Sequence, residues 1–107
     1  MRNIDTQELA DMRREVDQLT VINVLPPEKF RNRHIPDTIN IPVDEDDFVQ
    51  KVEAAAGSRD RPVVVYCASE GCDASENAAE KLDQAGFRQV YDYVGGCLLY
   101  TSDAADE

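Results

Sequence analysis

Residues 63–67 read Val63-Val64-Val65-Tyr66-Cys67, the most apolar stretch of the chain. Apolar and polar side chains do not alternate here, and such continuity is typical of a strand covered on both faces, as in a parallel sheet. Pro62 precedes the stretch and a polar loop follows it. The pattern therefore predicts a buried central strand that ends at Cys67.

Three further stretches are predicted to be strands. Residues 20–25 are short, apolar and β-branched and stop at Pro26-Pro27, residues 38–41 are closed by Pro42, and residues 89–94 come last. Helical patterns lie between these strands, so the chain alternates strand and helix. This alternation predicts an α/β domain with a mainly parallel sheet.

The helical segments have recognisable beginnings and ends. Asp5 and Glu8 have capping-box spacing, Pro27 begins a short helical turn that runs to Phe30, and acids at 44–47 suit the positive end of a helix. Gly57 and Gly86 are expected to stop the second and third long helices. The expected inner faces are Leu9, Met12, Val16 and Leu19 for the first helix, Phe48, Val52 and Ala55 for the second, and Ala78, Ala79, Leu82 and Ala85 for the third.

Composition restricts the function. The 107 residues suit one domain, and 22 acidic against 11 basic side chains give a net charge of -11. Such a charge argues against nucleic acid and anionic membranes as partners. No apolar run approaches the roughly 20 residues of a membrane span, and the N-terminus lacks the apolar stretch of a signal peptide, so we expect a cytoplasmic protein.

Residues 97–107 read CLLYTSDAADE. All eleven residues resemble the translation of a transposon-end adapter used in preparing sequencing libraries. We therefore expect residues 1–96 to form the native domain, truncated at its C-terminus, and residues 97–107 to be a non-native tail. The chain has three cysteines, an odd number that favours reactive or buried thiols over a disulfide framework, and on this interpretation Cys97 has no functional meaning.

Cys67 is the candidate reactive residue. In open α/β sheets, reacting groups gather at the carboxyl ends of strands, where helix N-termini point N–H groups at anions. Residues 68–75 lead from Cys67 into the next helix, and both loop amides and the positive helix end favour thiolate, the nucleophilic form. The position of Cys67 alone is equally compatible with a buried cysteine that has no reactive role.

Four segments in combination resemble a known family. Residues 34–42 read H-I-P-D-T-I-N-I-P and resemble the H-I-P-G-A-I-N-I-P signature of rhodanese-like domains, and residues 21–30 resemble the V-I-D-V-R-x-x-x-E-F segment before it. Residues 63–67 resemble the strand that delivers the catalytic cysteine, and residues 82–96 resemble the closing L-x-x-x-G-F-x-x-V-x-x-L-x-G-G. The resemblance covers the chain from about Ile4 to Gly96.

The resemblance implies a three-layer α/β/α domain with a mainly parallel five-stranded sheet and a C-terminal helix, which we expect to be truncated here. It also implies sulfur transfer, in which Cys67 takes a sulfane sulfur from a small-molecule or protein persulfide, holds it as a persulfide and passes it to a thiol acceptor. No metal or organic cofactor is implied. The loop expected to bind the persulfide comprises Ala68, Ser69, Glu70, Gly71, Cys72, Asp73, Ala74 and Ser75.

The chain departs from the family pattern at two places. Asn23 and Leu25 replace the usual Asp and Arg, so a supporting ion pair is absent. The loop is two residues longer than C-x-x-G-x-R-S and has no arginine, while Glu70 and Asp73 add carboxylates. Two like charges about 4 Å apart repel by several kcal/mol when poorly solvated, so thiosulfate is a doubtful donor. The missing arginine also weakens a phosphatase interpretation, which needs C-x5-R.

The other candidate residues allow more than one role. Cys72 either acts as a resolving thiol for Cys67 or packs as a small apolar side chain. His34 is the only histidine, which argues against a zinc site, and we expect it to hydrogen-bond the loop beside the first strand; Ser75 is expected to hydrogen-bond at the helix start. Two rival functions remain, namely a non-catalytic rhodanese-fold binding or regulatory module and a thiol redox switch of Cys67 and Cys72.

Overall fold

The computed structural model describes residues 2–17, 19–32, 34–67 and 73–94. It contains a five-stranded sheet of order β1-β5-β4-β2-β3 in which every neighbouring pair is parallel. The strands are β1 (Arg2–Ile4), β2 (Thr20–Asn23), β3 (Ile39–Asn40), β4 (Val63–Tyr66) and β5 (Val90–Tyr93). The predicted parallel α/β architecture is therefore confirmed.

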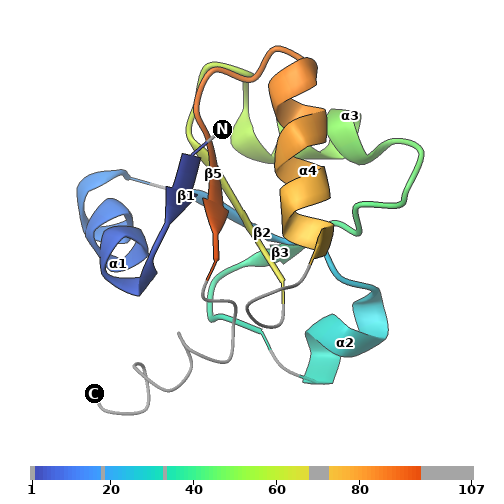
Figure 1. Cartoon of the computed structure of the whole chain (residues 1–107), viewed down its shortest axis with the longest axis horizontal. Helices are drawn as coiled ribbons and strands as arrows, with labels where there is room; N and C mark the ends of the chain where they lie inside the picture. Colours follow the sequence, from blue (N-terminus) through green and yellow to red (C-terminus); the bar gives the residue numbers. More distant parts are fainter. Residues whose placement is uncertain (1, 18, 33, 68–72, 95–107) are drawn as a thin grey trace.

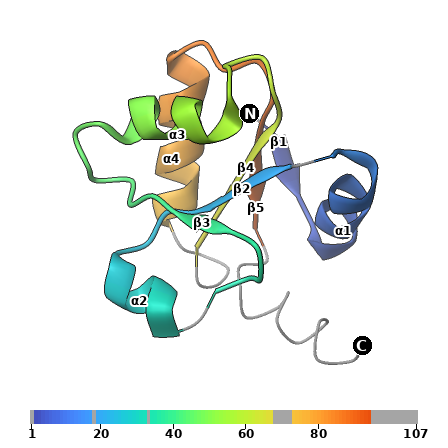
Figure 2. The ribbon, with the colours of Figure 1, turned by 180° about the vertical axis from the view of Figure 1, so that it is seen from behind.

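Helices cover both faces of the sheet (Figures 1 and 2). On one face lies α1 (Thr6–Glu15), and on the other lie α3 (Phe48–Ala56) and α4 (Asp73–Gln84). The short α2 (Pro27–Asn32) lies beyond the carboxyl end of β2. The arrangement gives the three layers that the resemblance implied, with α4 beginning at the edge of the sheet where the strands end.

The central strand β4 is buried along its whole length. Val63 and Val65 belong to the apolar cluster beneath α3 and α4, whereas Val64 and Tyr66 belong to the cluster beneath α1. Burial on both faces explains why polar residues do not interrupt residues 63–67. Transferring a valine side chain from water to such a core contributes about 1.5 to 3 kcal/mol, so this strand anchors both layers.

The first helix begins as predicted and ends earlier. Glu8 donates its backbone N–H to the Asp5 carboxylate at 2.8 Å, the Asp5 N–H donates to Glu8 Oε1 at 3.2 Å, and Ile4 packs in the same cluster as Leu9. The helix stops at Glu15 because Val16 takes an extended conformation. With β2 beginning at Thr20, few residues are left to turn the chain, and the prediction that the helix continues through Val16 and Leu19 was wrong.

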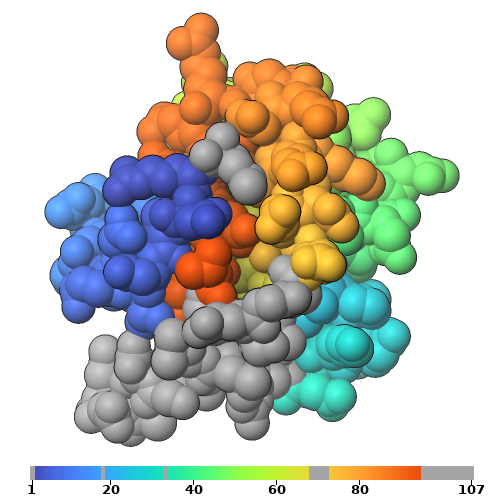
Figure 3. Space-filling view, viewed as in Figure 1, coloured from blue at the N-terminus to red at the C-terminus, as the bar shows by residue number. Residues whose placement is uncertain are grey.

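Two other details differ from the prediction. Ala55 is exposed and Ala56 is buried, because the buried stripe of α3 follows the i, i+4 row through Phe48 and Val52. Strand β1 is not apparent in the residue pattern, since two of its three residues are exposed and it exists only by pairing with β5. Figure 3 shows the β5 segment between the N-terminal residues and α4.

The predicted helix stops are confirmed. Gly57 and Gly86 have φ of +94° and +95°, in the left-handed region that glycine adopts without strain. Gly86 follows α4, and the N–H of Phe87 donates to the carbonyl of Leu82 at 3.1 Å. This bond returns the chain sharply from α4 toward β5.

Candidate active site

Cys67 lies directly after β4, at the carboxyl edge of the sheet, and only 2% of its surface is exposed. It packs in the cluster beneath α3 and α4, and its Sγ lies 3.5 Å from Oγ of Ser75. Ser75 is buried in the first turn of α4. The sulfur thus lies beside the N-terminal turn of α4, as the sequence predicts.

In the structure Cys67 is disulfide-bonded. The other two cysteines, Cys72 and Cys97, lie outside the described residues. A disulfide sulfur has no proton and cannot act as a nucleophile, so any nucleophilic role of Cys67 requires that a thiol first reduce this disulfide.

The predicted loop is described only in part. Asp73, Ala74 and Ser75 form the first turn of α4, with Asp73 exposed and Ser75 buried. Residues 68–72, including Glu70 and Cys72, lie outside the described residues. The Ser75 hydroxyl hydrogen-bonds with the Cys67 sulfur, and the predicted hydrogen bond of Ser75 at the helix start stays a prediction.

Asp92 is a site residue that the sequence interpretation missed. It lies in β5 on the face covered by α4, is 4% exposed, and hydrogen-bonds with Ser75. Burial raises the pKa of Asp92, and the hydrogen bond from Ser75 opposes part of that effect. A carboxylate inside an otherwise apolar strand, residues 90–94, was the signal that could have identified it.

Amide side chains hold the carboxyl end of β2. Asn23 Oδ1 accepts a hydrogen bond from the Leu25 N–H at 2.9 Å, and Asn40 Nδ2 donates to the carbonyls of Leu25 at 2.8 Å and Asn23 at 3.2 Å. Neutral hydrogen bonds thus stabilise the turn where the family pattern has an Asp and an Arg. Asn23 Nδ2 is buried with no acceptor among the described residues.

His34 has a local role. Its Nδ1 lies 2.7 Å from the carbonyl oxygen of Phe30, and its ring stacks on the Phe30 ring with centroids 4.0 Å apart. Both contacts hold His34 against Phe30 of α2. The expectation that His34 is structural agrees with these contacts.

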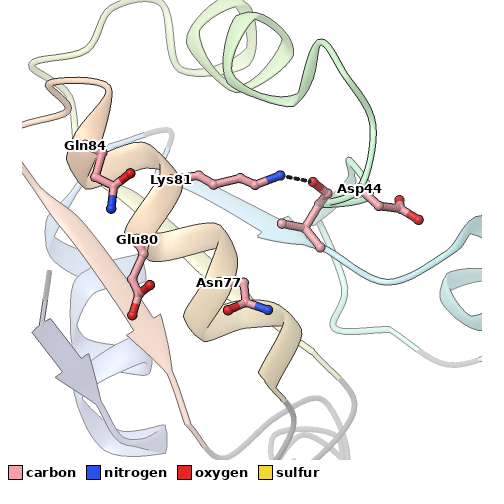
Figure 4. Close-up of a pocket in the computed structure, with 6 residues that line it drawn as sticks. Asp44, Asn77, Glu80, Lys81 and Gln84 are labelled. Atoms are coloured by element: carbon pink, nitrogen blue, oxygen red, sulfur yellow. Dashed lines mark hydrogen bonds between the residues drawn. The ribbon is translucent and has the colours of Figure 1, made fainter.

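A cavity of about 350 Å³ lies between α4 and the loop before α3 (Figure 4). Lys81 crosses it and donates from Nζ to the carbonyl of Val43 at 3.0 Å. Its lining residues are Val43, Asp44, Asn77, Glu80, Lys81 and Gln84. Cys67 does not line this cavity.

Two features are absent from the described part of the chain. No cluster of three or more histidine, cysteine or acidic side chains is positioned to hold a metal ion within residues 2–17, 19–32, 34–67 and 73–94. Over the same residues, no helix has the length and apolarity that crossing a membrane requires.

Comparison with known proteins identifies relatives over most of the chain. The model of the rhodanese-like domain family matches residues 5–103. The chain is 31% identical over 88 residues to thiosulfate sulfurtransferase GlpE of Pseudomonas savastanoi pv. phaseolicola, covering 81% of this chain and 76% of that protein.

A second curated relative is of a different kind. The chain is 34% identical over 74 residues to the HTH-type transcriptional regulator Rv0324 of Mycobacterium tuberculosis, covering 69% of this chain. The match spans 31% of the regulator's length. Among solved structures, a rhodanese-related protein from Thermoplasma volcanium has a TM-score of 0.71 at 27% identity, covering 96% of this chain and 93% of that one.

Proposed function

Because the chain belongs to the rhodanese-like domain family, we propose that it is a sulfurtransferase that carries sulfane sulfur as a persulfide on Cys67. The observation that carries the proposal is the position of Cys67 between the end of β4 and the first turn of α4, with Sγ 3.5 Å from the Ser75 hydroxyl. A helix N-terminus and a hydroxyl donor both stabilise a sulfur anion. The similarity to a thiosulfate sulfurtransferase supports sulfur transfer as the type of reaction.

The reaction exchanges one sulfur–sulfur bond for another. The Cys67 thiolate attacks the outer sulfur of a persulfide, R–S–SH, and the departing group leaves as the thiolate R–S⁻. An acceptor thiolate then attacks the outer sulfur on Cys67, which returns to its thiolate form. Each step forms one S–S bond and breaks another, so no external oxidant is consumed.

A low-molecular-weight or protein persulfide is the proposed donor, and a thiol is the proposed acceptor. The segment between Arg61 and Lys81 contains no basic residue, and Asp73 is exposed at the start of α4. A dianionic donor such as thiosulfate therefore meets a carboxylate and lacks the cation of the family loop. Reduced Cys67 fits the cytoplasmic location that we expect, where thiols are kept reduced.

Mass spectrometry of the reduced protein tests the proposal. After treatment with glutathione persulfide, we expect Cys67 to gain one sulfur atom, and added glutathione should remove it. Cys67→Ser should abolish the gain, whereas Cys72→Ser should retain it. If no donor places sulfur on Cys67 of the folded, reduced protein, the proposal is wrong.

A thiol redox switch is a second candidate, favoured by the disulfide at Cys67. Its activity would depend on both Cys67 and Cys72, whereas sulfur transfer needs only the first. A non-catalytic binding module is the third, favoured by the missing loop arginine and by the similarity to part of a transcriptional regulator. Its partner binding should survive both serine substitutions.

A further inference from the structure

Three buried side chains from different elements meet beneath the start of α4. Cys67 follows β4 and is 2% exposed, Ser75 lies on α4 and is 4% exposed, and Asp92 lies on β5 and is 4% exposed. Ser75 is the common partner, because it is 3.5 Å from the sulfur and also hydrogen-bonds the carboxylate. The Oδ1 atom of Asp92 is buried and has no donor among the described residues.

When Cys67 is reduced, the donors and acceptors of the hydrogen bonds among Cys67, Ser75 and Asp92 are fixed. An ionised carboxylate only accepts, so the Ser75 hydroxyl donates its proton to Asp92. The oxygen of Ser75 then remains available to accept the proton of the Cys67 thiol. The three groups form a hydrogen-bonded series from the Cys67 thiol through the Ser75 hydroxyl to the Asp92 carboxylate. One proton can move along each of its two hydrogen bonds.

Among the described residues, neither the strand neighbours of Asp92 nor the buried face of α4 supplies a positive side chain. Across the sheet, Asp92 pairs with Val65 on one side and Asn3 on the other. The side chains that α4 buries are Ser75, Ala78, Ala79 and Leu82, and none is ionisable. No lysine or arginine occurs between Arg61 and Lys81, so two anions would lie close together with no nearby cation in that segment.

Two such anions destabilise each other. When like charges share a poorly solvated site, one of the two groups keeps its proton. Burial already raises the pKa of Asp92 above its ordinary value, which favours the protonated carboxyl beside an anionic sulfur. A carboxylate protonated at the moment when the sulfur becomes anionic removes this repulsion.

We propose that Asp92 accepts, through Ser75, the proton that Cys67 loses on becoming nucleophilic, and returns it when the sulfur has been passed on. This inference rests on the proposed sulfur transfer and assigns Asp92 as a positioning and proton-accepting residue that acts through Ser75. In the forward step the Ser75 proton moves to Asp92 and the thiol proton moves to Ser75. The products are the Cys67 thiolate and a neutral Asp92, and total charge is unchanged.

The transfer steps follow with the proton held on Asp92. The thiolate takes the outer sulfur from the donor, whose S–S bond breaks and which leaves as a thiolate. An acceptor thiolate removes that sulfur and regenerates the Cys67 thiolate. The proton then returns from Asp92 through Ser75 to Cys67, so the site finishes as it began.

The pH dependence of Cys67 alkylation tests this inference without any sulfur donor. The reduced protein is treated with iodoacetamide, and fragmentation of the peptide separates the adduct at Cys67 from that at Cys72. A coupled thiol–carboxylate pair ionises in two macroscopic steps, so we expect the alkylation rate of the unmodified protein to rise in two steps with pH. Asp92→Asn should leave one step and slow alkylation about tenfold near pH ~6, which corresponds to roughly one pKa unit.

Two further variants separate the relay from a structural effect. Ser75→Ala should also remove the lower step, because it deletes the bridging hydroxyl. Asp60→Asn removes an exposed carboxylate that pairs with Arg88 and should keep both steps. Thermal unfolding of each variant shows whether the fold is intact.

The outcomes separate the inference from the proposed function. Two steps in Asp92→Asn, or a single step in the unmodified protein, would overturn the proton relay while leaving sulfur loading on Cys67 to be judged by mass. Failure of every donor to load Cys67, with two alkylation steps still present, would overturn sulfur transfer but not the coupling of Cys67 to Asp92.

Discussion

The phenol oxygen of Tyr66 lies 3.1 Å from the backbone nitrogen of Ile35, which joins the last residue of β4 to the loop after α2. Thr38 completes the contact, because its Oγ1 lies 2.8 Å from the same phenol oxygen and donates to the Ile35 carbonyl at 2.7 Å. The backbone of Ile35, the Tyr66 phenol and the Thr38 hydroxyl therefore form a closed ring of hydrogen bonds that includes the residue before Cys67.

Removing the phenol oxygen should destabilise the fold. Tyr66→Phe leaves the buried Ile35 N–H without its acceptor, which costs about 1 to 3 kcal/mol of unfolding free energy. Urea unfolding measures this change. Tyr91→Phe is the control, since the hydroxyl of this half-buried residue has no hydrogen bond within the described part of the chain; an equal loss in both variants would contradict the assignment.

The capping box of α1 predicts a smaller loss. Asp5→Ala removes the acceptor for the Glu8 N–H and should lower the unfolding free energy by about 1 kcal/mol. Chemical denaturation again provides the measurement. Asp46→Ala changes the charge equally in the exposed loop before α3 and should have little effect, so a comparable loss there would show that charge, not capping, is responsible.

The end of α4 depends on the backbone conformation of Gly86. At φ of +95° a side chain brings strain, although no atom lies within 4 Å of the position of an added Cβ. Gly86→Ala should therefore cost about 1 kcal/mol, and Gly86→Asn should cost less because asparagine tolerates the left-handed region better. Thermal melts compare the two variants. Equal stability of Gly86→Ala and the unmodified protein would show that the turn relaxes.

Asp92 should make stability depend on pH. Its pKa is higher in the folded protein than the ordinary value of 3.8, because burial disfavours the charged form. The unfolded chain therefore loses this proton more readily, and the penalty for burying the charge grows as pH rises from about 3.8 through the folded pKa.

Asp92→Asn removes that penalty while keeping an acceptor for the Ser75 hydroxyl. We expect the variant to gain stability over the unmodified protein at neutral pH, and the gain to disappear as pH falls to the unfolded pKa. Urea titrations at several pH values measure the difference. Asp60→Asn should show no such trend because its carboxylate is exposed, and a pH-independent difference for Asp92→Asn would refute the prediction.

The choice of sulfur donor should respond to charge at the start of α4. Asp73→Arg places a cation six residues after Cys67 and should raise the rate of loading from thiosulfate several-fold relative to that from glutathione persulfide. Glu80→Arg makes the same charge change farther along the exposed face of α4 and should have a smaller effect. The rates of loading from thiosulfate and from glutathione persulfide are measured by quenching each reaction at set times and determining the mass of the intact protein. Equal changes in both variants would show a general effect of net charge.

Local patterns predicted much of the fold. Unbroken apolar residues at 63–67 indicated the buried strand, Asp5 and Glu8 located the beginning of α1, and Gly57 and Gly86 located two helix ends. These features depend on contacts within a few residues, so the sequence contains them directly. The edge strand β1 was missed because two of its three residues face solvent and its pairing partner lies almost ninety residues away, at Tyr91–Tyr93.

The sequence by itself determined that the chain is a parallel α/β domain and that Cys67 lies at the carboxyl end of its central strand, because side-chain periodicity and burial report local structure. Only the tertiary structure decided which groups surround the sulfur. Ser75 and Asp92 come from separate elements, and the register of β5 against β4 places the carboxylate beside α4. Hydrogen bonds among residues far apart in sequence leave no periodic signal, so the environment of Cys67 follows from the packing of α4 on the sheet.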